Sequence, residues 1–330
     1  MAIPKTTYDH IDDNKKRTFI ILVLFPITFA VLAYLTILLI TPFVNVSDGS
    51  INYSAQGSFY TPQAWAMANT YAAYIIPGVL ICLGIWVSAS LFYGDDIILN
   101  SSKAVEVTSQ TQRELYNLVD SVAITAGLPT PKIYLIDDNN LNAYATGRKP
   151  ENASIALTTG LVKRLNRQEL EGVIAHEMSH IGNRDTRLMI IVVVGITFFV
   201  LLGQIVLRSA RHAKKQAALL LFCLGLFFML YGYLIAPILR FALSRRREYQ
   251  ADATAALITR NPAALASALE KISGNSAVKS LSDMETVSPM CIANPMSGNG
   301  GLVSALGGIT ATHPPIEKRV KALREMDGRI

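Results

Sequence analysis

Charged residues are scarce in this chain of 330 residues: they make up 16% of it, against about 25% in an ordinary soluble protein. Cysteine is scarcer, with three residues and no C-x-x-C spacing, which excludes a disulfide scaffold and a thiolate zinc site. The 21 glycines and 14 prolines are too few for a collagen-like or low-complexity chain. Apolar residues take up the difference, at 51% of the chain with a mean hydropathy of +0.34. This balance predicts a membrane protein.

Long stretches of the chain contain no Asp, Glu, Lys or Arg at all. A helix of about 20 apolar residues is long enough to span the hydrocarbon core of a bilayer, which is about 30 Å thick. Four stretches meet this requirement, and we expect about four transmembrane helices in them: Thr18–Ile40, Tyr71–Tyr93, Leu188–Leu207 and Ala217–Leu239.

The distribution of Lys and Arg predicts the orientation of these helices. Four basic residues lie in the tail of residues 1–17, whereas the loop over residues 41–70 has none. Because basic loops stay in the cytoplasm, we expect the N-terminus and the soluble segments there. The connector between the last two stretches is also basic, so the hairpin over residues 188–239 is expected either to cross the membrane or to dip into it. The net charge of +6 then reflects membrane flanks, and no nucleic-acid partner is expected.

The predicted organisation is a multi-pass protein of the cytoplasmic (inner) membrane, with one soluble domain built from two separate segments. Its parts, in chain order, are a cytoplasmic tail (1–17), two transmembrane helices (18–94) with an outside loop (45–70), the first part of a catalytic domain (95–187), the membrane hairpin (188–239) and the second part of that domain (240–330).

The first soluble segment shows both helical and strand patterns. Apolar residues at helical spacing predict an amphipathic helix over Thr108–Ala126, which Gly127 and Pro129 end. Alternating or short apolar runs predict strands over Lys132–Ile136, Asn142–Gly147 and Ser154–Thr158, the last closed by Thr159-Gly160. Asn166 and Glu169 have the spacing of a capping box, which predicts that a further helix begins there.

That further helix contains the sequence His176-Glu177-Met178-Ser179-His180. Two histidines four residues apart lie on one face of a helix, so both imidazoles can bind one zinc ion. The glutamate beside the first histidine is then placed to take a proton from a water molecule and to pass it to a leaving amine. We therefore predict His176 and His180 as zinc ligands and Glu177 as the general base.

A third ligand decides whether this pair of histidines is a metal site. Zinc in hydrolases commonly takes two histidines and one carboxylate. Glu248 and Asp252 follow the last apolar stretch and lie one helical turn apart, so Glu248 can ligate zinc while Asp252 accepts a hydrogen bond from a ligating histidine. The alternative is a surface helix on which Glu248 pairs with Arg245 or Arg247. The two apolar stretches in between form a hairpin that returns to its own side, which favours the zinc site.

Several motifs resemble those of the M48 family of membrane metallopeptidases, and most closely its bacterial heat-shock branch. They are NAYATG, TTGLVKRLNRQELEGVIAHEMSHIGNRD, SRRREYQADATAA and THPPIEKRV. The resemblance implies an α+β fold, with a zincin-like (gluzincin) domain that has a small sheet. It implies one zinc ion per chain, bound by His176, His180 and Glu248, with Asp252 behind a ligand.

The same resemblance implies roles for two residues near the C-terminus. His313, in His313-Pro314-Pro315, would lie near the zinc and stabilise the oxyanion, and Arg319 would support the site. Taken from the residues alone, His313 before two prolines is equally compatible with a surface turn.

The NAYATG segment has a physical role of its own in this prediction. An exposed edge strand beside the active helix can pair with the main chain of an extended substrate. We therefore expect a substrate-binding edge strand at this position; its residues are Asn142, Ala143, Tyr144, Ala145, Thr146 and Gly147. Gly147 fits a close backbone approach, or simply a turn.

The predicted function is that of a zinc-dependent endopeptidase whose site faces the cytoplasm. The resemblance implies membrane-protein quality control under stress, with unfolded or damaged membrane proteins as substrates and possible self-cleavage. A related prenyl-protein (CAAX) protease is the alternative among enzymes. A non-catalytic zinc-binding membrane scaffold is the alternative among non-enzymes, although an intact Glu177 beside a three-ligand site argues against it.

Overall fold

The computed structural model describes residues 62–212, 245–273, 291–292 and 314–327, and, with gaps, residues within 16–53 and 218–232. The chain divides into two units. The first contains residues 1–14, 90–194 and 237–330, and the second contains residues 15–89 and 195–236. We describe each unit by itself.

The first unit contains a four-stranded mixed sheet in the order β3-β4-β6-β5. Its central strands, β4 (Lys132–Ile136) and β6 (Ser154–Thr158), are parallel and have the limits predicted from the sequence. Strand β5 (Ala143–Thr146) lies antiparallel to β6 at one edge, inside the predicted segment 142–147. Strand β3 (Val105–Val107) forms the other edge. It was not predicted, because three residues are too few to show an alternating pattern.

Helix α3 (Arg113–Ala126) has the predicted amphipathic face, with Leu115, Leu118, Val119, Val122 and Ala123 all buried. It begins later than predicted, because Thr108–Gln112 forms a turn closed by a bond from the Thr111 backbone N–H to the Thr108 carbonyl. Its end at Gly127, which has a left-handed φ of 66°, is as predicted.

Helices α4 (Thr159–Arg164) and α5 (Arg167–Gly182) follow the sheet directly. The Thr158 side chain accepts a hydrogen bond from the Leu161 N–H and caps α4, so Thr159-Gly160 starts a helix instead of closing a strand. The predicted capping box of α5 is confirmed: the Asn166 side chain accepts from the Glu169 N–H, and the Glu169 carboxylate accepts from the Asn166 N–H.

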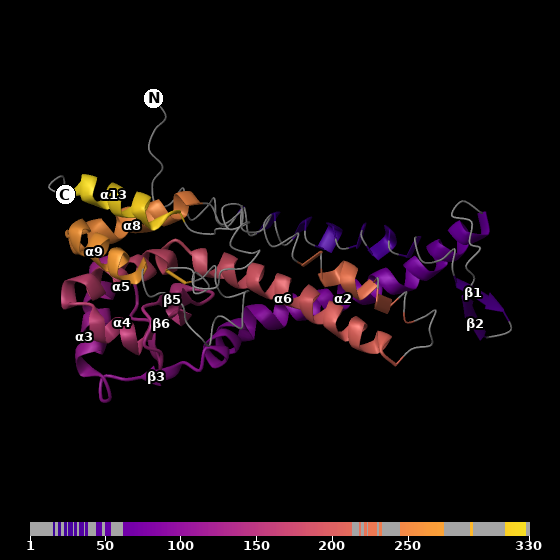
Figure 1. Ribbon diagram of the computed structural model, residues 1–330, viewed down its shortest axis with the longest axis horizontal. Coiled ribbons are helices and arrows are strands. Elements are labelled where there is room, and N and C mark those ends of the chain that lie inside the picture. Colours follow the sequence, from indigo (N-terminus) through magenta and orange to yellow (C-terminus); the bar gives the residue numbers. More distant parts are fainter. Residues whose placement is uncertain are drawn as a thin grey trace, which may run out of the picture. The chain divides into compact units, whose positions relative to one another are not determined.

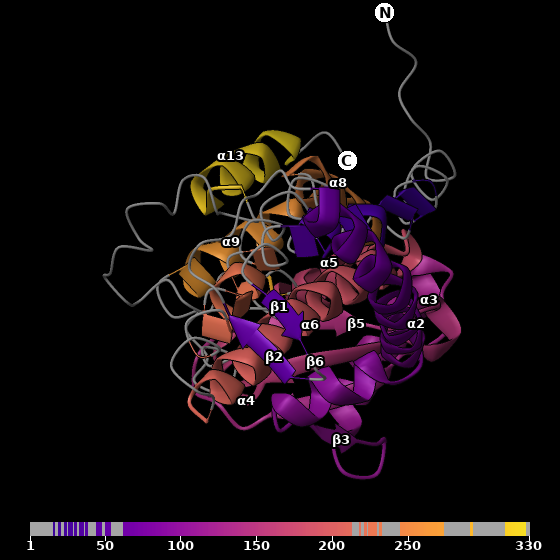
Figure 2. The ribbon, with the colours of Figure 1, turned by 90° about the vertical axis from the view of Figure 1, so that its right-hand side faces the viewer.

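Helix α5 is the central helix of the first unit and is buried along most of its length. It contacts β5 of the sheet, α3, and two later helices, α8 (Arg245–Thr259) and α9 (Pro262–Ser273). Helix α13 (Ile316–Met326) packs on α9 and α8. Figures 1 and 2 show α8, α9 and α13, in orange and yellow, gathered along α5. The histidine motif therefore lies in the buried interior of this unit.

Helix α2 (Pro62–Ser101) contains the second predicted transmembrane stretch. Among the described residues, its segment Trp65–Ala89 is long and apolar enough to cross a membrane, by length and composition. Large apolar side chains point outward from it, including Tyr74 at 78% exposed and Ile85 at 65%. Helix α6 (Asp185–Ala210) contains the third stretch. The first and fourth stretches fall partly outside the described residues, so four crossings stay a prediction.

Within the second unit, three large side chains form a small buried cluster: Leu83, Phe199 and Tyr231. Gly203 and Gly225 let two helical segments approach closely, because a Cβ on either residue would lie within 3.0 Å of the other's carbonyl oxygen. A two-stranded hairpin, β1 (Val44–Ser47) with β2 (Ser50–Tyr53), lies in the loop predicted to be outside.

Candidate metal centre

Helix α5 carries His176 and His180 one turn apart on the same face, as their spacing requires. Their Nε2 atoms are 3.2 Å apart, and both side chains are buried. Burial of two imidazoles side by side is favourable only if their nitrogens find partners.

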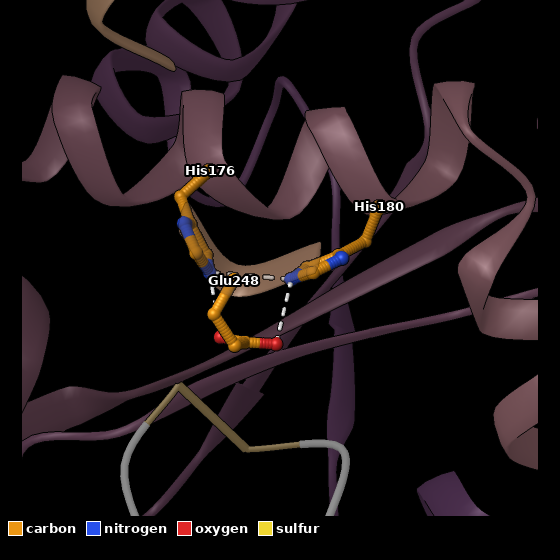
Figure 3. A group of neighbouring side chains, drawn as sticks. All are labelled: His176, His180 and Glu248. Atoms are coloured by element: carbon orange, nitrogen blue, oxygen red, sulfur yellow. Dashed lines mark hydrogen bonds and ion pairs between the residues drawn. The ribbon is translucent and has the colours of Figure 1, made fainter. Parts of the chain in front are cut away.

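The partner that both histidines share is Glu248, which α8 brings to α5. One oxygen of its carboxylate lies 3.7 Å from Nε2 of His176 and the other 3.7 Å from Nε2 of His180. Figure 3 shows the carboxylate facing both rings. Ligand atoms of the three residues lie within 4.8 Å of one another, and all three side chains are buried. Two imidazoles and one carboxylate, converging in this way, fit a zinc ion.

Asp252 lies behind His176, one helical turn after Glu248. Its Oδ1 is 3.0 Å from Nδ1 of His176, which leaves Nε2 to face Glu248. Arg319 of α13 holds the same carboxylate from two sides: its Nε donates to Oδ2 at 2.8 Å and its Nη2 to Oδ1 at 2.7 Å. Burial raises the pKa of Asp252, but the Arg319 guanidinium outweighs it and the pKa is lowered. The carboxylate is therefore ionised when it orients the ring.

Asp185, the first residue of α6, occupies the corresponding place behind His180 and was missed in the sequence. Its Oδ2 lies 2.9 Å from Nδ1 of His180, and Nη1 of Arg247 donates to its Oδ1 at 3.0 Å. Arg247 thus pairs with Asp185, and Glu248 is buried, so the predicted alternative of a surface helix on which Glu248 pairs with Arg245 or Arg247 is wrong. The available signal was an acidic residue five positions after the second histidine.

The carboxylates around His180 favour positive charge at this site. Burial lowers the pKa of His180, but the hydrogen bond to Asp185 and the charge of Glu248 raise it to about 9. Surroundings that stabilise a proton on this ring also stabilise a metal cation in its place.

Glu177 is buried next to the three candidate ligands. Its carboxylate accepts a hydrogen bond from the backbone of Ala145, and its Oε2 has no hydrogen-bond partner in the described part of the chain. Burial raises the pKa of Glu177 to about 7, with His180 acting against the shift and Glu248 adding to it. A carboxyl group that titrates near neutral pH can both take and give a proton there.

Strand β5 lies at the edge of the sheet, but the predicted exposure of that edge is wrong. All four of its residues are buried. Tyr144 pairs antiparallel with Cys291, and the Ile292 N–H donates to the Ala143 carbonyl at 2.9 Å. The position expected for a substrate main chain is therefore taken, at this point, by the chain's own residues 291–292.

The remaining residues of the predicted edge serve the fold. The Asn142 side chain accepts a hydrogen bond from the Ala143 N–H, and Thr146 Oγ1 donates to Asp95 at 2.6 Å. Gly147 has a φ of 133°, and a Cβ there would lie 2.6 Å from the Ala153 Cα. Its close approach is thus to the chain's own backbone. His313 lies outside the described residues.

Comparison with known proteins matches this chain to proteases. The sequence pattern of peptidase family M48 matches residues 109–327. Two proteins described as protease HtpX homologs match nearly end to end: one from Bacteroides fragilis (strain YCH46) is 39% identical over 94% of this chain and 96% of its own length, and one from Dictyoglomus thermophilum is 37% identical over 99% and 97%. A third, from Dictyoglomus turgidum, is 45% identical over 71% of this chain and 76% of its own. The crystal structure of S. mikatae Ste24p aligns with a TM-score of 0.44 and 21% identity, over 78% of this chain and 60% of that one.

Proposed function

Because this chain belongs to peptidase family M48 and is a metalloprotease, we propose that it is a zinc endopeptidase that cleaves unfolded or damaged membrane proteins at the cytoplasmic face of the cytoplasmic membrane. The observation that carries the proposal is the buried convergence of His176, His180 and Glu248 beside the carboxylate of Glu177. A structural zinc site has four protein ligands and needs no adjacent base, whereas this cluster has three candidate ligands and a carboxylate beside them.

His176, His180 and Glu248 would hold the zinc ion. Both histidines direct Nε2 toward Glu248, because each Nδ1 is engaged by an aspartate. Zinc, when bound there, supplies a Lewis acid that polarises the peptide carbonyl and the attacking water.

Glu177 would act as the proton carrier of the reaction. As a base it takes a proton from the attacking water, and as an acid it returns that proton to the leaving amine. In the metal-free site burial already raises the pKa of Glu177 to about 7, so its carboxyl group is not held permanently in one protonation state at neutral pH. By the family resemblance His313 would stabilise the developing negative charge on the carbonyl oxygen.

The substrate would be bound through its main chain, which explains how unrelated unfolded proteins can be accepted. Strand β5 offers an outer edge beside Glu177, and an extended peptide can pair with it once residues 291–292 have left. Main-chain pairing needs little from the substrate side chains, so broad cleavage, including self-cleavage, follows.

The membrane location is supported by the outward apolar side chains of α2 and by the helix segment Trp65–Ala89. A bilayer solvates such side chains, whereas water does not. Basic residues in the tail 1–17 support a cytoplasmic N-terminus. The enzyme would then meet its substrates, damaged membrane proteins, in the same bilayer and act in quality control under stress.

The test compares the wild type with Glu177→Gln. Both are purified in detergent with a chelator, then given zinc and either an unfolded protein or a prenylated peptide. We expect the wild type to cut the unfolded protein and itself, and Glu177→Gln to bind zinc without cutting. Cleavage of the prenylated peptide alone would point to the CAAX-type alternative. Zinc binding without cleavage of any substrate by the wild type would support the scaffold alternative.

A further inference from the structure

The two candidate zinc histidines are each backed by a buried arginine–aspartate pair from a different helix. His176 is backed by Asp252 and Arg319, and the aspartate contacts its Nδ1 at 3.0 Å. His180 is backed by Asp185 and Arg247, and the aspartate contacts its Nδ1 at 2.9 Å. In both cases Nε2 faces one oxygen of Glu248 at 3.7 Å. The site is therefore supported symmetrically, although the two aspartates are far apart in the sequence.

Asp185, like Asp252, is buried and has a partner on each of its carboxylate oxygens. Asp185 is 1% exposed, and each of its carboxylate oxygens has its own partner, His180 on Oδ2 and Arg247 on Oδ1. The buried Arg247 guanidinium lies 3.0 Å from Asp185 and favours the charged form of its carboxylate. An ionised carboxylate on Nδ1 fixes the imidazole tautomer whose Nε2 lone pair is open to a metal.

Arg247 connects this support to the third ligand. Arg247 is the residue immediately before Glu248 on α8. Its partner Asp185 is the first residue of α6, three positions after the end of α5. The ion pair therefore ties the start of α6, which follows the histidine helix after two residues, to the first turn of the glutamate helix. A change in this pair would alter both the orientation of His180 and the distance between His180 and Glu248.

We propose that Asp185 is a positioning residue for His180, and that Arg247 holds Asp185 in place. The inference rests on the proposed zinc site, since the orientation of His180 matters only if its Nε2 binds the metal. Removal of such a carboxylate behind a ligating histidine typically weakens metal affinity by about 10–100-fold. The competing explanation is that Asp185 and Arg247 only tie two helices together.

The test measures zinc affinity and stability separately, on the full-length chain in detergent. Every protein carries Glu177→Gln, so that self-cleavage cannot interfere. Zinc affinity is measured by competition with a chromophoric chelator, and the melting temperature is measured without metal. We expect Asp185→Asn to weaken zinc binding by about 10–100-fold, and Arg247→Gln to weaken it less in the same direction.

The matched control is Glu169→Gln. Glu169 is also a buried carboxylate of α5, with partners Ser267 and Lys271, but it belongs to the capping box and not to the histidine site. We expect this control to lower the melting temperature without a change in zinc affinity.

The outcomes separate the explanations. If Asp185→Asn lowers the melting temperature as the control does but binds zinc as tightly as its parent, the positioning role is overturned. If Asp185→Asn does not fold, unchanged zinc affinity in Arg247→Gln would overturn it equally. If the Glu177→Gln parent itself binds no zinc, the proposed function fails, and that result is distinct from either of the others.

Discussion

At the scale of single residues, burial of Glu177 lowers the stability of the metal-free folded protein when its carboxyl group is ionised. Burial raises its pKa from 4.5 to about 7, so the folded chain holds this proton more tightly than the unfolded chain does. The folded state is then favoured at low pH, and the metal-free protein loses stability as the pH rises from about 4.5 to about 7. The loss amounts to about 3 kcal/mol, because one pKa unit corresponds to about 1.4 kcal/mol.

We therefore predict that Glu177→Gln stabilises the metal-free protein at pH 8, because the amide cannot ionise in the buried site. Thermal unfolding with a chelator present, at pH 8 and at pH 4, measures the effect, which should nearly vanish at pH 4. Glu169→Gln is the control with the opposite sign. Burial raises the pKa of Glu169, but Lys271 and Ser267 lower it overall, so its loss should destabilise the protein at pH 8. A lower melting temperature for Glu177→Gln at pH 8 would contradict the prediction.

At the scale of secondary-structure elements, the proposed binding of substrate to the outer edge of β5 requires that residues 291–292 leave this edge. The Ile292 N–H to Ala143 carbonyl bond flanks the pair of Tyr144 and Cys291, so this is a closely spaced, non-hydrogen-bonded pair. Such pairs have Cα atoms about 4.5 Å apart, a separation that a disulfide can bridge. Residues 291–292 can thus be locked on the strand.

We predict that Tyr144→Cys, oxidised to a disulfide with Cys291, cuts unfolded protein at a rate near zero, and that a phosphine reductant restores cleavage. Cys82→Ser and Cys223→Ser remove the other thiols. The same protein is compared before and after reduction, which cancels any effect of losing the tyrosine. Adding Cys291→Ser should make cleavage insensitive to oxidation. Undiminished cleavage by the locked protein would mean that substrates do not use this edge.

Features formed within one helix could be predicted from the sequence, whereas contacts between distant segments could not. The capping box at Asn166, the amphipathic face of α3 and the single face shared by His176 and His180 follow from spacing along one helix. The pairing of residues 291–292 with β5, and the contact of Asp185 with His180, join segments whose approach is set by packing. No periodicity in the sequence records such contacts.

At the scale of the whole molecule, the predicted orientation places the tail and the soluble domain in the cytoplasm and the loop 45–70 outside. Single cysteines in a cysteine-free chain test it: Lys16→Cys in the tail, Ser58→Cys in the loop and Lys163→Cys on an exposed turn of α4. In intact cells, a membrane-impermeant thiol reagent should label only Ser58→Cys, because the bilayer shields the other two. Permeabilised cells should show labelling of all three. Labelling of Lys163→Cys in intact cells would reverse the orientation.

The short connection between α5 and α6 sets a limit on where this enzyme can cut. His180 is eight residues before Leu188, the start of the third predicted transmembrane stretch. Even a fully extended chain of that length covers only about 30 Å. With that stretch in the bilayer, the zinc centre lies no farther than this length from the start of the membrane helix. Scissile bonds farther from the membrane surface must therefore move toward the zinc centre before they can be cut. On the proposed function, the soluble domains of damaged membrane proteins would therefore be cut first near their membrane-proximal ends.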